Sequence, residues 1–135
     1  MADGLSKQLT GNVGLFYVCL ELSKLGWNVL ITSRNAKGVD IVVYSEEAKR
    51  THTIQVKALS GREAVSVGSN INSLIADFVV ICRMVLEPKP EVFILTNKEA
   101  KSIVHSQNDG SNWLEKKDYE AFKNDDWNKI GNGWD

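Results

Sequence analysis

Two short apolar runs that carry polar residues at fixed positions constrain this sequence more than any other feature. Residues 38–44 contain Asp40, and residues 54–58 contain Gln55 and Lys57. Side chains alternate between the two faces of a strand, so Gln55 and Lys57 share one face. If the two runs pair as a hairpin, a carboxylate, an amide oxygen and an ammonium group meet at one place. Oxygen ligands of this kind suit a hard cation such as Mg²⁺, and a lysine beside them can act on a water that attacks a phosphodiester.

The length and composition of the chain limit the number of domains and the class of protein. The 135 residues, with 43% apolar and 24% charged residues, predict one globular domain over 1–135. Cys19 and Cys82 both lie in apolar runs and are predicted to be buried thiols in a reducing compartment, and the first residues lack the pattern of a signal peptide. We therefore expect a cytoplasmic protein. No run reaches the roughly 18 apolar residues of a membrane span, so we expect no membrane partner.

The periodicity predicts an α/β fold in which one mixed β-sheet is flanked by helices. Helical spacing over residues 12–25 predicts a largely buried helix that ends at Gly26. Strands are expected over 27–32, 39–44, 51–59, 64–67, 78–86 and 92–96, one or two helical turns over 70–76, and helices over 97–106 and 118–123. The aromatic residues of the last part predict a tail anchored on the body: Trp113, Tyr119, Phe122, Trp127 and Trp134.

The order of helix, strand, Asp-bearing strand and Lys-bearing strand resembles the PD-(D/E)xK nuclease superfamily. Asp40 stands at the position of its aspartate, and Gln55-Val56-Lys57 stands at the position of its acid-x-Lys motif. A group of small restriction-endonuclease-like domains resembles it further, through Gly11-Asn12-Val13-Gly14, Gly26-Trp27 and Ser33-Arg34-Asn35-Ala36-Lys37-Gly38-Val39-Asp40. The resemblance covers about residues 10–105. It implies a restriction-endonuclease-like αβββαβ core, with a C-terminal extension over 106–135.

The resemblance implies a metal-dependent DNA endonuclease. Asp40, Gln55 and the backbone carbonyl of Val56 would hold Mg²⁺ or Mn²⁺, and Asp40, Gln55 and Lys57 would be the catalytic residues. DNA is the expected partner, and a homodimer is a further expectation because two sites can cut two strands. Arg34 and Lys37, in the loop before Asp40, are candidate phosphate contacts. The formal net charge is −1, so DNA binding requires a local basic patch.

Two departures from the pattern leave other functions open. Leu15 stands where the resembling domains commonly have a glutamate on the first helix, and Gln55 replaces an acid with a neutral oxygen. Leu15 falls on the apolar stripe of the helix, and Glu21 is too far around and along the helix to replace the missing acid. One alternative is therefore a catalytically impaired module that binds nucleic acid or protein. Another is a structural domain with no role in nucleic-acid binding.

Other chemistries have little support. His52 and His105 are far apart and neither neighbours a cysteine, so a zinc site is not expected. The glycines at 11 and 14 lack the Gly-Lys-Ser/Thr ending of a phosphate loop. Trp113 and Trp127 can be read either as rings that stack on nucleic-acid bases or as anchors of the tail.

Overall fold

The computed structural model describes residues 6–33 and 37–135. Its elements follow the order α1 (Lys7–Lys24), β1 (Asn28–Ile31), β2 (Ile41–Tyr44), β3 (Thr51–Ala58), β4 (Val65–Ser66), η1 (Ile71–Ser73), β5 (Phe78–Arg83), β6 (Glu91–Thr96), α2 (Asn97–Ile103), β7 (Val104–Ser106), β8 (Asn112–Leu114), α3 (Lys116–Tyr119) and η2 (Glu120–Phe122), where η denotes a short 3₁₀ helix. Among these helices, none is long and apolar enough to cross a membrane.

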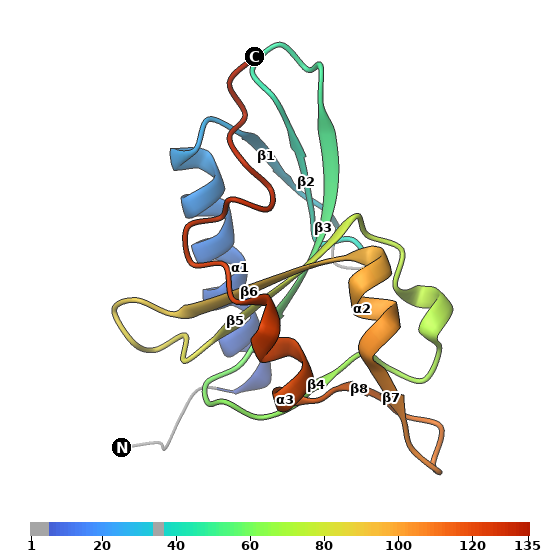
Figure 1. Cartoon of the computed structure of the whole chain (residues 1–135). Helices are drawn as coiled ribbons and strands as arrows, with labels where there is room; N and C mark the ends of the chain where they lie inside the picture. The colour runs from blue at the N-terminus through green and yellow to red at the C-terminus, as the bar shows by residue number, and fades with distance from the viewer. Residues whose placement is uncertain (1–5, 34–36) are drawn as a thin grey trace.

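The main sheet has five strands in the order β1-β2-β3-β5-β6. Strands β3 and β5 are parallel, and every other neighbouring pair is antiparallel. Helix α1 lies against one face of this sheet, and α2 lies on the other side (Figure 1). The prediction of a mixed sheet flanked by helices is therefore confirmed.

Helix α1 begins at Lys7, earlier than predicted, and the residues 11–14 lie inside it rather than at its start. Ser6 caps the helix, because its hydroxyl accepts a hydrogen bond from the Leu9 N–H at 3.2 Å. Gly14 lies on the buried side of α1, where a Cβ atom would overlap the Cβ atom of Ala58 on β3. The glycine therefore serves close packing of α1 on the sheet, not an anion-binding turn.

Two predicted elements are shorter in the structure. The strand predicted over 78–86 ends at Arg83, because Met84 takes a positive φ of 56°. The helix predicted over 97–106 ends at Ile103, and the chain continues as β7. Strands β4, β8 and β7 form a second, three-stranded sheet. Strand β4 lies within the strand predicted over 64–67, whereas β7 and β8, of three residues each, are too short for an alternating pattern to be recognised in the sequence.

The main sheet separates two apolar cores. The core on the α1 side contains Val18, Leu22, Ile41, Val43, Ile54, Val80, Cys82, Ile94 and Trp127. The core on the other side contains Val65, Leu74, Val79, Ile81, Phe93, Leu95, Ala100, Leu114 and Tyr119. Both cysteines are free thiols, and burial raises the pKa of Cys82 to about 12. Cys19 is only half-buried, so the prediction of a buried thiol is correct for Cys82 and wrong for Cys19.

The C-terminal segment runs back along the α1 side towards the turn between β2 and β3 (Figure 1). Trp127 is buried, and its ring centroid lies 6.4 Å from that of Tyr17 on α1. Further along, the Gly133 N–H donates to the Leu25 carbonyl at 2.9 Å. The predicted aromatic tail is thus packed on the body of the protein, as expected.

Candidate active site

Asp40 is held against β3 by two hydrogen bonds. It lies immediately before β2, beyond the last strand pair, which joins Ile41 to Ile54. Its N–H donates to the Ile54 carbonyl at 2.9 Å, and its Oδ2 accepts from the Val56 N–H at 2.7 Å. A carboxylate offers several lone pairs on two oxygens, so this side chain can still accept a further donor or a cation. The strand end thus presents a positioned carboxylate.

Gln55 and Lys57 extend from the face of β3 opposite to α1. Their neighbours in β5, Val79 and Ile81, belong to the core on that side of the sheet. Burial lowers the pKa of the Lys57 ammonium, and the nearby charge of Asp40 acts in the opposite direction. The structure therefore brings Asp40, Gln55 and Lys57 to one place, although their catalytic roles stay predictions.

The oxygen atoms at this place fit a hard cation. Gln55 Oε1 is buried and has no hydrogen-bond partner, a state that is unfavourable unless a ligand supplies one. The N–H and C=O of one strand residue point to the same edge, so the Val56 carbonyl faces the side where Asp40 lies. Within residues 6–33 and 37–135, no three His, Cys, Asp or Glu side chains gather as a metal site. A cation here would therefore rely on one carboxylate, neutral oxygens, water and substrate phosphate, a set that Mg²⁺ accepts.

The loop before Asp40 packs closely against η1 at Gly38. Gly38 has a φ of 77°, and a Cβ atom there would lie 2.6 Å from the Ser73 carbonyl oxygen, so both conformation and space require glycine. Lys37, a predicted phosphate contact, is exposed. Arg34, the other predicted contact, lies outside the described residues.

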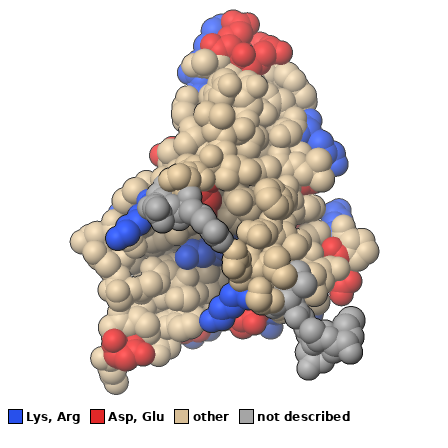
Figure 2. Space-filling model, turned by 180° about the vertical axis from the view of Figure 1, so that it is seen from behind, with Lys and Arg blue, Asp and Glu red and all other residues tan. Residues whose placement is uncertain are grey.

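Basic groups are unevenly distributed over the surface. Figure 2 shows several Lys and Arg groups in and around the hollowed middle of the face seen from behind, whereas the largest acidic patch lies at its upper end. A formal net charge of −1 is therefore compatible with a locally basic surface. Local charge of this kind attracts phosphates even when the whole molecule is slightly acidic.

Helix α1 carries no carboxylate at position 15, where the resembling nuclease domains commonly have a glutamate. Leu15 is half-buried and packs against the α1-side core, so the prediction of an apolar role is supported, although the side chain is not fully buried. Glu21 forms an ion pair with Lys24 at 3.2 Å on the same helix. This ion pair is consistent with the expectation that Glu21 does not replace the missing acid.

A pocket of about 460 Å³ begins at Lys57. Its wall follows the chain through Ser60 and Glu63 to Ser66, and Trp113 on β8 and the first turns of α1 complete it. Sequence reasoning did not place Glu63 or Ser66 beside Lys57, and it left Trp113 open between two roles. The second sheet brings these residues together, and its short strands gave no sequence signal for that pairing.

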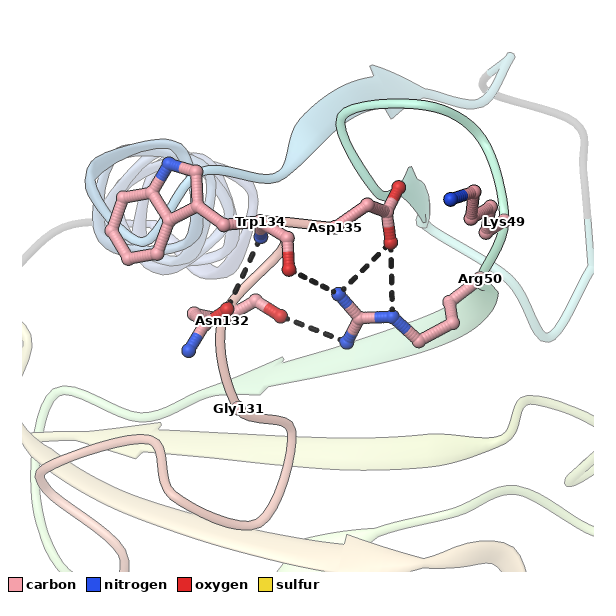
Figure 3. Close-up of a pocket in the computed structure, with 6 residues that line it drawn as sticks. All are labelled: Lys49, Arg50, Gly131, Asn132, Trp134 and Asp135. Carbon is pink, nitrogen blue, oxygen red and sulfur yellow. Dashed lines mark hydrogen bonds and ion pairs between the residues drawn. The ribbon is translucent and has the colours of Figure 1, made fainter.

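A larger pocket, of about 590 Å³, lies at the C-terminal segment and has a structural explanation. Figure 3 shows the Arg50 guanidinium beside the C-terminal segment, with its nitrogens directed at Asn132, Trp134 and Asp135. It donates to the carbonyls of Asn132 at 2.9 Å and Trp134 at 3.0 Å, and it pairs with Asp135 at 3.3 Å. These contacts tie the C-terminal segment to the start of β3. The donors of Arg50 are directed at the tail, so we assign this pocket to the attachment of the tail and not to substrate.

Two solved structures share the architecture. A bacterial homing endonuclease, I-Ssp6803I, is 19% identical in sequence and matches with a TM-score of 0.53 over 70% of this chain and 71% of its own. Hjc, a Holliday junction resolvase of Archaeoglobus fulgidus, is 13% identical and matches with a TM-score of 0.55 over 78% of this chain and 91% of its own. No protein-family model matches the sequence, and a comparison with curated proteins gives no match. The chain therefore shares its fold with these two nucleases, and the restriction-endonuclease-like fold expected from its sequence is confirmed.

Proposed function

We propose that this protein is a metal-dependent endonuclease that hydrolyses phosphodiester bonds in DNA. The observation that carries the proposal is the group at the β2–β3 strand end: a positioned Asp40 carboxylate, a buried Gln55 oxygen without a partner, and the partly buried Lys57 ammonium. The fold supports DNA as the substrate class, since a homing endonuclease and a Holliday junction resolvase share it.

In this proposal, one group of residues binds the metal and Lys57 acts on the attacking water. Asp40, Gln55 and the Val56 carbonyl would hold Mg²⁺ or Mn²⁺, which when bound supplies positive charge that polarises the phosphoryl group. Lys57 would orient the attacking water and stabilise negative charge that develops on the phosphate. Because burial lowers the pKa of Lys57, its amine also releases a proton at a lower pH than an ordinary lysine. Lys37 and Arg34 would contact the DNA backbone.

A second candidate function is a binding module that has lost catalysis. The observation in its favour is the first helix, where Leu15 packs into the core and Glu21 pairs with Lys24, so neither residue gives the site a second carboxylate. Such a protein would bind DNA or a protein partner and leave the phosphodiester intact. The two candidates share the fold and differ in one measurable property, cleavage.

The test compares cleavage with binding. The protein is incubated with supercoiled and with branched DNA in Mg²⁺ or Mn²⁺, and DNA binding is measured separately by fluorescence anisotropy. Lys57→Ala should reduce cleavage by about 100-fold or more, the scale of a lost acid–base group, while the Kd for DNA changes little. Lys49→Ala is the matched control, because Lys49 is an exposed lysine on the turn before β3, 3.4 Å from Glu47.

Metal binding has its own readout in the protein without DNA. Mn²⁺ should raise the melting temperature of the wild type, because a ligand that binds only the folded state stabilises it. Asp40→Asn retains an oxygen acceptor for the Val56 N–H but removes the charge, and it should reduce this rise. Wild-type protein that binds DNA and leaves it uncut in both metals would instead support the binding module.

A further inference from the structure

The pocket beside Lys57 has a feature that phosphodiester hydrolysis alone does not require. Trp113 forms part of its wall, so an indole ring lies in the same hollow as the proposed catalytic lysine. Trp113 pairs with Ser66 of β4 and with His105 of β7 in the second sheet. Neighbouring residues of this register, Val65 and Leu114, are buried in the core. Side chains alternate along a strand, so Ser66 and Trp113 face away from that core.

The indole is held in place at one edge. Trp113 Nε1–H donates to the Ser111 hydroxyl at 2.9 Å, and that hydroxyl donates to Asp109 Oδ1 at 2.6 Å. The ring is half-buried, which leaves part of its surface in the pocket. An aromatic ring that is fixed by its polar edge and open on one side is suited to stacking a planar group.

The rest of the pocket offers polar contacts around a space of suitable size. Its volume of about 460 Å³ lies within the range of roughly 300–1,000 Å³ typical of small-ligand pockets, and one nucleotide falls in that class. Ser60, Ser66 and Glu63 can exchange hydrogen bonds with the edge of a base, and Lys7 and Lys57 can face a phosphate. The lining therefore combines the three contacts that a nucleotide needs: a stacking surface, polar groups for the base edge and cations for the phosphate.

We propose that this pocket receives one unstacked base of the DNA substrate, placed on Trp113, next to the phosphate that is cleaved. The inference rests on the proposed function, because Lys57 belongs both to the candidate site and to the pocket wall. A base in a continuous duplex exposes only its edges in the grooves, so its face reaches an indole only after it leaves the stack. The preferred substrate is therefore DNA with an unpaired or easily extruded base at the cleavage site.

The test measures binding in EDTA, so that cleavage does not enter. Three DNAs of one sequence are compared by anisotropy: a perfect duplex, the same duplex with one bulged nucleotide, and the single strand. The wild type should bind the bulged and single-stranded DNAs more tightly than the perfect duplex. Trp113→Ala should weaken binding of these two by about 5- to 150-fold, the scale of a lost base–aromatic stack of about 1–3 kcal/mol, and should leave the perfect duplex unchanged.

Two further variants and one spectroscopic signal keep the result interpretable. Trp113→Phe retains an aromatic face and should retain most of the preference, even if Trp113→Ala is too unstable to measure. Trp134→Ala removes an exposed indole outside the pocket, which packs over Gly26, and should leave the preference intact. A 2-aminopurine at the bulged position should be quenched by the wild type and by Trp113→Phe, because both can stack on it.

The outcomes separate this inference from the proposed function. Trp113→Ala could weaken binding of all three DNAs equally, or weaken binding of none of them. If it does so while the wild type still cleaves DNA and Lys57→Ala does not, the base pocket is wrong and the nuclease proposal stands. An unquenched 2-aminopurine in a tight complex overturns the base pocket in the same way. If the wild type binds none of the three DNAs in EDTA but cleaves DNA in Mg²⁺ or Mn²⁺, the base pocket alone is wrong. If it neither binds nor cleaves DNA, the proposed function fails, and the base pocket fails with it.

Discussion

The two faces of β3 differ in chemistry although they consist of alternate residues of one strand. Ile54 is fully buried and Val56 packs beside it, on the face where α1 lies. On the opposite face, Gln55 carries a buried oxygen without a partner, and Lys57 carries an ammonium group whose pKa is lowered by burial. The first face is arranged for stability, while the second carries polar groups that stability alone does not explain.

This difference is typical of a strand that supports a site. A buried polar atom without a partner lowers the stability of a fold, so the position of Gln55 Oε1 beside Asp40 is consistent with a function that compensates for that loss. The apolar face can hold the strand in position while the polar face stays open to ligand. Substitutions on the apolar face should therefore lower stability far more than substitutions on the polar face.

The largest effect is expected on the apolar face. Ile54→Ala removes a fully buried side chain and should lower the free energy of unfolding by about 2–5 kcal/mol, because it loses apolar contacts and leaves a cavity. Urea denaturation followed by circular dichroism measures this change. A loss below about 1 kcal/mol would mean that this face is less tightly packed than the structure indicates.

A smaller effect is expected where α1 meets β3. Gly14→Ala places a methyl group against Ala58 and should destabilise the protein by about 1–3 kcal/mol. Gly11→Ala is the matched control: no atom lies within 4 Å of a Cβ atom there, so this change should stabilise the helix by about 1 kcal/mol. Ala58→Gly should restore much of the loss in the Gly14→Ala background, and purely additive effects in a double-mutant cycle would contradict the proposed overlap.

The smallest effect on stability is expected on the polar face. Gln55→Met keeps the length of the side chain and removes the buried oxygen, so stability in the absence of metal should stay within about 1 kcal/mol of wild type or rise slightly. Gln55→Glu should behave differently, since it adds a carboxylate near Asp40 and should be less stable without metal and regain stability with Mn²⁺. Thermal melting with and without Mn²⁺ checks both variants. If Gln55→Met were as destabilising as Ile54→Ala, the two faces of β3 would not differ in the way proposed.

Local patterns were sufficient to predict much of the main sheet. The alternation around Asp40, Gln55 and Lys57 predicted a hairpin with the polar residues on one side, because side chains of a strand alternate regardless of what surrounds them. The predicted helix, strands and mixed sheet are present in the structure. The start of α1 was misplaced because Gly11 and Gly14 suggest a turn, whereas Gly14 serves close packing on Ala58, which lies far along the chain.

Other features depended on contacts that a single sequence does not reveal. The strands β7 and β8 are three residues long, and α2 ends earlier than predicted because Val104 pairs with Leu114 in the second sheet. That pairing also places Trp113 in the pocket of Lys57. A pairing between such short strands is stabilised by the core beneath them, and not by local propensity.

The sequence by itself therefore determined the strand face on which the candidate chemistry lies, since alternation depends only on the backbone. Tertiary structure alone decided that Gln55 Oε1 is buried without a partner, that the Lys57 pKa is lowered, and that an indole lies in the pocket beside Lys57. Burial and desolvation depend on the other segments that pack around a residue, and those segments are distant in the sequence.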